Sequence, residues 1–115
     1  MYQVSEERFE ELVDDALDAI PAHFARQLTN VAVLVRPYNE EEPSLLFLYV
    51  GVPLTERTFD HTGFLPDAIF IYRDTLEAMC HSEEQLAHEV KVTVFHEVGH
   101  YFGMSEEQLH ALGWG

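Results

Sequence analysis

Apolar residues recur every three or four positions near the start of the chain, which is the period of an amphipathic helix. They are Phe9, Leu12, Val13, Ala16, Leu17 and Ile20. Ser5 stands before them where an N-cap belongs and acidic residues follow it, so we expect a helix that begins directly after Ser5. Pro21 interrupts this pattern, and residues 22–28 are expected to form a kinked continuation or a second short helix.

Three short apolar runs, at residues 31–35, 45–50 and 68–72, predict β-strands. The acidic segment 37–43 has a turn-forming composition and separates the first two runs, so we expect them to pair as a hairpin. Residues 51–67 contain Gly and Pro but few periodic apolar positions, and an irregular connection is expected there. Connections of this length are often functional.

The C-terminal third of the chain has a second helical pattern. Residues 74–80 are expected to form one or two turns, and Ser82 is expected to cap a long helix that ends near Phe102. Gly103 suits the left-handed position after a helix, and Ser105 marks the start of a short last helix. The order of helix, strands and helices predicts an α+β fold in which helices pack on a small sheet.

Length and composition limit the class of protein. A chain of 115 residues with 47% hydrophobic residues can build one core, so we expect a single domain over residues 1–115. Its formal charge is −15, from 6 Lys and Arg against 21 Asp and Glu. This balance argues against nucleic acid and anionic membranes as partners, because both are bound through clustered basic residues. It is compatible with basic ligands, although it is first of all typical of a soluble surface.

No segment of the sequence predicts export or membrane insertion. The N-terminus lacks a basic region followed by an apolar run, and the longest apolar stretch, residues 45–54, has about half of the ~20 residues that a spanning helix needs. Cys80 is the one cysteine, which excludes an internal disulfide and a cysteine-rich zinc site. We therefore expect a cytoplasmic protein.

The long helix carries His96, Glu97 and His100 in the pattern H-E-x-x-H. Residues four apart lie on one face of a helix, so both imidazoles can bind one metal ion while Glu97 flanks its open position. Zn²⁺ is the expected ion, because neutral imidazoles suit it and a water bound to it becomes a nucleophile that Glu97 can deprotonate. Glu97 is therefore the candidate catalytic residue.

The surroundings of this motif favour one metal ion that interacts with all three side chains. Between residues 92 and 102 the helix is apolar on nearly all sides, so it is expected to lie in the core. Two imidazoles and a carboxylate on such a helix need partners, and one metal ion would satisfy all three. The alternative is a pair of histidines that the helix dipole favours and that are hydrogen-bonded locally.

A third protein ligand must come from outside this face of the helix. Gly103 reverses the chain, so the segment after it can fold back toward the histidines. Glu106 follows His96 by ten residues, the position of the last ligand in the pattern H-E-x-x-H-x-x-G-x-x-H, and a carboxylate oxygen is an acceptable zinc ligand. Glu106 is the first candidate, and His110 and Glu107 are the alternatives.

Several segments in order, residues 51–57, 65–74, 92–107 and 112–114, resemble the minimal zincin-like metallopeptidases of bacteria. The resemblance is carried by several motifs rather than by the zinc pattern alone. It implies a reduced zincin fold, in which a small mixed β-sheet packs against an N-terminal helix and an active-site helix. It also implies a metal motif of the form H-E-x-x-H-x-x-G-x-x-[DE].

Position by position, the resemblance implies that His96, His100 and Glu106 bind the metal and that Glu97 is the general base. The chain differs from the metzincins in its acidic third ligand. It also has no room for a Met-turn, since 11 residues follow Met104. The substrate specificity of metzincins therefore does not transfer to this chain.

Two supporting roles are left open by the sequence. A peptidase holds the carbonyl oxyanion with the metal and a Tyr, His or Arg donor. The available donors are His61, Tyr72, Arg73 and His110. Glu89 and Thr93 precede His96 by seven and three residues, so either could orient its imidazole. The alternative for these two is an exposed Glu and a Thr that packs against a neighbouring helix.

The sequence therefore predicts a zinc-dependent hydrolase that cleaves peptide bonds in peptide or protein substrates, with basic substrates favoured by the charge. A second hypothesis is a binding module that keeps the metal for stability or recognition, because a chain this small provides few substrate contacts for catalysis. A third is a metal-free protein whose acidic surface binds a basic partner.

Overall fold

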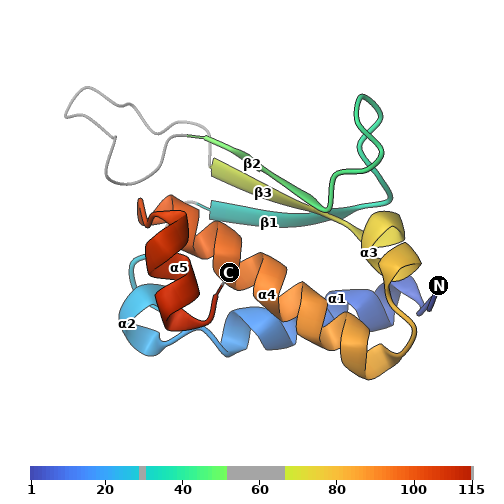
Figure 1. The fold of residues 1–115 in the computed structure, drawn as a ribbon, viewed down its shortest axis with the longest axis horizontal. Helices are drawn as coiled ribbons and strands as arrows, with labels where there is room; N and C mark the ends of the chain where they lie inside the picture. The colour runs from blue at the N-terminus through green and yellow to red at the C-terminus, as the bar shows by residue number, and fades with distance from the viewer. Residues whose placement is uncertain (29–30, 52–66, 115) are drawn as a thin grey trace.

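The structure, a computed structural model, describes residues 1–28, 31–51 and 67–114. Its elements are α1 (Glu6–Asp18), α2 (Ala22–Ala25), β1 (Val31–Arg36), β2 (Phe47–Val50), β3 (Asp67–Tyr72), α3 (Arg73–Met79), α4 (Glu83–Tyr101) and α5 (Glu106–Leu112). The strands form one sheet, and α1, α2, α4 and α5 lie together on one side of it (Figure 1). The predicted α+β class, with a small sheet against an N-terminal helix and the long helix of the motif, is confirmed.

Three helices begin at serines that the sequence marks as caps. Ser5 and Ser82 each accept a hydrogen bond from the backbone N–H three residues later. Ser105 forms a capping box with Gln108, in which each side chain accepts from the other residue's backbone N–H. These bonds satisfy amide groups that the first helical turn leaves unpaired. α2 ends at Ala25, earlier than expected, and the chain continues from it in turns.

The predicted hairpin between the first two strands is wrong. The strand order is β1-β3-β2, so the last strand lies between the two that precede it. β3 pairs in parallel with β1, from Val31 opposite Asp67 to Arg36 opposite Tyr72, and antiparallel with β2. The sheet is therefore mixed. The irregular connection expected before β3 falls at residues 52–66, which lie outside the described residues.

Burial explains why β3 is the central strand. Its Ile69 and Ile71 side chains are 1% and 0% exposed. In β2, by contrast, the exposed Leu48 and Val50 alternate with half-buried aromatic residues, which is typical of an edge strand. β3 is the most buried of the three strands, and pairing it along both of its edges removes more of its apolar surface from water than a local hairpin of β1 and β2 would.

α4 runs through the core of the helical layer and packs against α1. Its buried residues are Leu86, Val90, Thr93, Val94, Phe95, Glu97, Val98, Gly99 and Tyr101. One carboxylate, that of Glu97, is thus buried among apolar side chains, as the pattern of the helix predicts. In the described ranges, no helix combines the length and the apolar character that crossing a bilayer requires.

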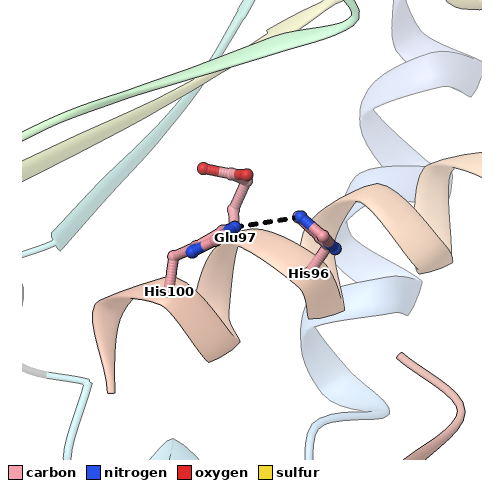
Figure 2. Close-up of side chains that lie close together, drawn as sticks. All are labelled: His96, Glu97 and His100. Atoms are coloured by element: carbon pink, nitrogen blue, oxygen red, sulfur yellow. Dashed lines mark hydrogen bonds between the residues drawn. The ribbon is translucent and has the colours of Figure 1, made fainter. Parts of the chain in front are cut away.

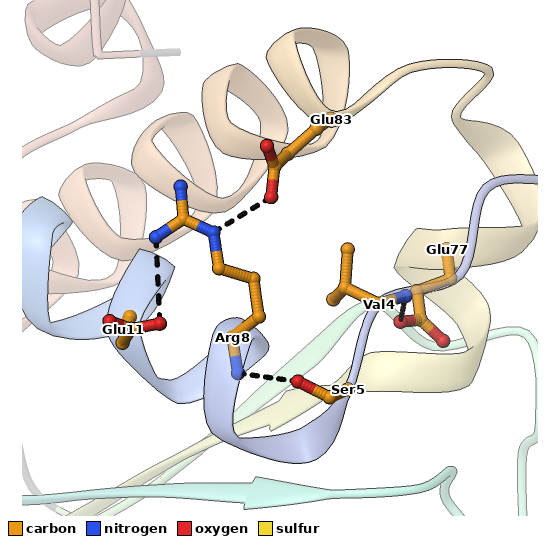
Figure 3. A network of polar contacts seen from close by, with 6 residues as sticks. All are labelled: Val4, Ser5, Arg8, Glu11, Glu77 and Glu83. Carbon is orange, nitrogen blue, oxygen red and sulfur yellow. Dashed lines mark hydrogen bonds and ion pairs between the residues drawn. The ribbon is translucent and has the colours of Figure 1, made fainter.

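Polar contacts attach the N-terminal segment to α3 and to the start of α4 (Figure 3). The Nε atom of Arg8 donates to Glu83 at 2.7 Å, and the guanidinium also lies 3.6 Å from a carboxylate oxygen of Glu11. The buried carboxylate of Glu77 accepts a hydrogen bond from the backbone N–H of Val4 at 3.0 Å. These contacts hold α1 against the helix that carries the motif.

Candidate metal centre

His96 and His100 lie one turn apart on the side of α4 that faces the sheet, and their rings point toward one another (Figure 2). Their Nε2 atoms are 2.9 Å apart, and the ring centroids are 4.6 Å apart. This distance is that of a hydrogen bond between the two ring nitrogens, in which the tautomers decide which one donates. The two ring nitrogens thus converge on one point beside the helix.

Glu106 brings a carboxylate oxygen to the same point. Its Oε1 atom lies 3.3 Å from the Nε2 atom of each imidazole. The side chains of His96, His100 and Glu106 are 17%, 37% and 63% exposed, so the cluster opens toward solvent on the side of Glu106. Of the three residues that the sequence offers as a third ligand, Glu106 is the one whose contact with both histidines is present.

The turn after α4 carries Glu106 back to the histidines. Gly103 has a φ of 76°, in the left-handed region that favours glycine. Its N–H donates to the carbonyl of His100, and the N–H of Met104 donates to the carbonyl of Gly99, both at 2.9 Å. This pair of bonds is the Schellman motif, which ends a helix and reverses the chain.

Gly99, which lies between the two histidines, allows α5 to approach α4 closely. A Cβ atom on Gly99 would collide with the Cδ2 atom of Leu109 and lie 3.3 Å from its Cγ atom. Leu109 is fully buried, so it has little room to move. Glycine inside a helix is unfavourable by about 1 kcal/mol relative to alanine, so its presence at position 99 is a signal in the sequence for this close approach.

The three converging atoms fit a zinc ion. Bonds of about 2.0–2.1 Å at tetrahedral angles hold neighbouring ligand atoms about 3.3 Å apart. Two of the three separations in the cluster are 3.3 Å, and the third is 2.9 Å. Two imidazoles and a carboxylate are also a donor set that suits Zn²⁺ and that leaves one position for a non-protein ligand.

Glu97 lies beside this cluster but is closed off from solvent. It is 1% exposed, and its Oε1 atom has no hydrogen-bond partner within the described part of the chain. A carboxylate oxygen of Glu97 lies within 4.8 Å of the ligand nitrogens of both histidines. Burial, and to a smaller extent the negative charge of Glu106, raises the pKa of Glu97 to about 7. A buried carboxylate oxygen without a partner is costly, and such a group is a candidate for a role in the site rather than in the fold.

Phe47 of β2 covers His96 from the side of the sheet. The two ring centroids are 5.7 Å apart, and the ring planes are tilted by 48°. This contact restrains the imidazole and brings an edge strand next to the cluster. No pattern in the sequence indicates it, because it depends on the order of the strands.

The residues expected to orient His96 lie in different surroundings. Thr93 is buried at 5% exposure. The negative charge of Glu89 contributes, after burial, to the raised pKa of the Cys80 thiol, so Glu89 lies near Cys80. A role of either residue in orienting the imidazole stays a prediction.

The candidate oxyanion donors are distributed over the molecule. The Tyr72 hydroxyl accepts a hydrogen bond from the side-chain amide of Asn39 at 2.9 Å. Arg73 forms an ion pair with Glu6 at 3.1 Å. His110 is exposed on α5, one turn after Glu106. His61 lies outside the described residues.

Comparison with known proteins agrees with this geometry. The sequence model of the family described as "zincin-like metallopeptidase" matches residues 28–114. A solved structure, that of a conserved hypothetical protein from Thermo thermophilus, is similar with a TM-score of 0.61 and 27% sequence identity. That similarity covers 95% of this chain and 97% of the other. No curated protein matches the chain. Since the family match covers most of the chain, including the whole of α4 and α5, the protein belongs to the zincin-like metallopeptidase family.

Proposed function

We propose that this protein is a zinc-dependent metallopeptidase, in which His96, His100 and Glu106 bind the ion and Glu97 is the general base. The observation that carries the proposal is the convergence of two Nε2 atoms and one carboxylate oxygen from two helices, with mutual distances of 2.9 to 3.3 Å. The family membership supports a peptidase over other hydrolases.

The chemistry that bound Zn²⁺ supplies is Lewis acidity, which lowers the pKa of a bound water and polarises a carbonyl group. The protein contributes the proton transfers. Glu97 accepts the proton of the attacking water at a carboxylate oxygen and then donates it to the leaving amine nitrogen. Its burial prevents bulk water from competing for that proton, and the fixed position of α4 keeps the carboxylate beside the cluster.

A peptide substrate can reach this cluster along β2. Among the described strands, β2 lies at one edge of the sheet, and an extended peptide can add to such an edge through main-chain hydrogen bonds. The contact of Phe47 with His96 places this strand next to the histidines. A peptide paired with β2 would therefore pass close to His96.

The decisive experiment compares wild type with Glu97→Gln, each loaded with zinc. We expect cleavage of a peptide library to fall by about 10²- to 10⁴-fold in the variant, while the zinc content stays at one ion per chain. Glu107→Gln is the matched control, since Glu107 is an exposed glutamate on the neighbouring helix. Wild-type protein that binds zinc and cleaves no member of the library would support the non-catalytic binding module instead.

A further inference from the structure

A groove runs between α1 and the edge of β1 that no described strand covers, outside the cluster of the proposed catalytic site. One cavity of about 210 Å³ lies there, with Val13 and Leu17 among its lining residues. A second cavity of about 290 Å³ shares Leu17 and Val33 with the first, but Ile69 of β3 and Val98 of α4 also line it, so it extends beneath the sheet. The groove at the edge therefore follows β1 along residues 33–36.

The lining of the first cavity includes the main-chain edge of β1. Four consecutive residues, 33–36, contribute to it. Successive side chains of a strand point to opposite faces of the sheet, so a cavity that contacts all four reaches the edge between the faces. β3 covers the other edge of β1, and no strand in the described ranges pairs with this one. The edge therefore offers main-chain donors and acceptors to a further strand, although the Arg36 side chain, which also lines the cavity, already donates to the carbonyl of Val35 at 2.9 Å.

The helical wall of the groove is acidic at its rim and apolar at its floor. Glu10, Asp14 and Asp18 follow one another at four-residue spacing on α1, and all three are exposed. Glu10 and Asp14 line the first cavity together with Val13 and Leu17. Within the described part of the chain, none of these three carboxylates forms an ion pair.

We propose that the free edge of β1 is a docking site for an extended, basic segment of a partner protein, which adds to the sheet as a further strand. Every second side chain of the segment faces α1, where the stem of a Lys or Arg packs on Val13 and Leu17 and its charge lies near Glu10 and Asp14. The intervening side chains lie beside Leu34 on the opposite face and are apolar.

The net charge of the chain favours one kind of binding partner for this groove. A formal charge of −15 attracts a basic polypeptide and opposes a second copy of this chain in the same groove. The length of β1, six residues, sets the length of the segment that it can pair with. An alternation of basic and apolar residues over about six positions is thus the expected binding motif.

The probe for this site is an eight-residue peptide of alternating Lys and Val, with its binding followed by NMR at low salt. We expect the amide signals of residues 31–36 to shift on titration, and a peptide of alternating Glu and Val to cause no shift. N-methylation of every second peptide nitrogen, on the edge that pairs with β1, should abolish binding. Added salt should weaken binding, because the carboxylates are exposed.

Two charge variants on α1 separate docking in the groove from general attraction. Asp14→Lys should lower the affinity at least about fivefold, because Asp14 lines the groove. Asp15→Lys changes the net charge equally, but Asp15 lies where its charge acts on Arg8, and the affinity should change less than twofold. Equal losses in both variants would overturn the proposal, as would shifts confined to β2. Sedimentation that shows dimers formed through β1 would assign the groove to a second copy instead.

Discussion

Glu77 and Glu97 are both buried glutamates, but the fold satisfies only the first. Glu77 is 4% exposed, and its carboxylate accepts the backbone N–H of Val4. Glu97 is 1% exposed, and its Oε1 atom has no partner among the described residues. The first carboxylate ties the N-terminus to α3. Burial of the Glu97 carboxylate costs free energy of folding, and no contact in the described core compensates for it at the Oε1 atom.

The charged groups around these two glutamates differ in the same way. Near Glu77, the guanidinium of Arg8 pairs with Glu83 and with Glu11, so this cluster contains its own cation (Figure 3). Near Glu97, two imidazoles and a carboxylate direct their ligand atoms at one point. The Arg8 cluster pairs its carboxylates with a cation of the protein and stabilises the fold. The cluster beside Glu97 has no such cation, which is typical of a site that binds one.

Of the variants considered, removal of a histidine should have the largest effect, which is on zinc affinity. His100→Ala deletes one of three proposed ligands, so zinc affinity should fall more than about 100-fold, since even the outer partners of metal ligands contribute 10- to 100-fold. A competition assay with a zinc chelator measures the affinity. His110→Ala is the matched control on the exposed side of α5 and should leave it unchanged within about twofold. Equal losses in the two variants would contradict the assignment.

The metal-free protein should lose stability as the pH rises. The pKa of Glu97 is about 7 in the folded protein against an ordinary value of 4.5. Between these values the folded state keeps a proton that the unfolded state has released, so stability is full below about pH 4.5 and is lost as the pH rises through 7. The loss is about 3 kcal/mol.

Chemical denaturation at a series of pH values measures this dependence. Glu97→Gln should remove the fall in stability, because no carboxyl group titrates at that position. Glu77→Gln is the matched control and should keep the fall, since Glu97 is intact. A decline that persists in Glu97→Gln would show that other groups cause it.

Gly99→Ala should weaken both the fold and the metal centre. The added methyl group meets Leu109, and overpacking of this kind costs about 1–3 kcal/mol. It should also displace α5 and with it Glu106, so zinc affinity should fall. Thermal unfolding with and without zinc separates the two effects. A variant that binds zinc like wild type would show that the approach of α5 does not position Glu106.

The smallest effect on stability is expected for the ion pairs of Arg8 near Glu77. Arg8 and Glu83 form an ion pair whose side chains are 39% and 42% exposed. Exposed pairs contribute little and are screened by salt, so Arg8→Ala should lower the melting temperature by no more than about 5 °C. Zinc affinity should not change. A large loss of zinc binding in this variant would break the contrast between the two clusters.

Much of this molecule is predictable from local sequence signals. The serine caps of α1, α4 and α5, the glycine after α4 and the spacing of the histidines are all features within a few residues of chain. The fold class follows from the order of these elements. Glu106 could be proposed because a helix end and a ten-residue offset determine where it returns.

The strand order and the contacts around the histidines could not be predicted in this way. The hairpin was expected because residues 37–43 look like a turn, but the pairing depends on how much apolar surface β3 buries along both edges. The contact of Phe47 with His96 follows from that strand order. The role of Gly99 depends on the approach of Leu109 from another helix.

A crystal structure of the zinc-loaded protein, with an anomalous difference map at the zinc edge, tests the central claim most directly. We predict one anomalous peak per chain, about 2.0–2.2 Å from the Nε2 atoms of His96 and His100 and from a carboxylate oxygen of Glu106, with Glu97 beside it but not bonded to it. A peak at any other place, or imidazoles that remain hydrogen-bonded to each other in the presence of zinc, would contradict the account.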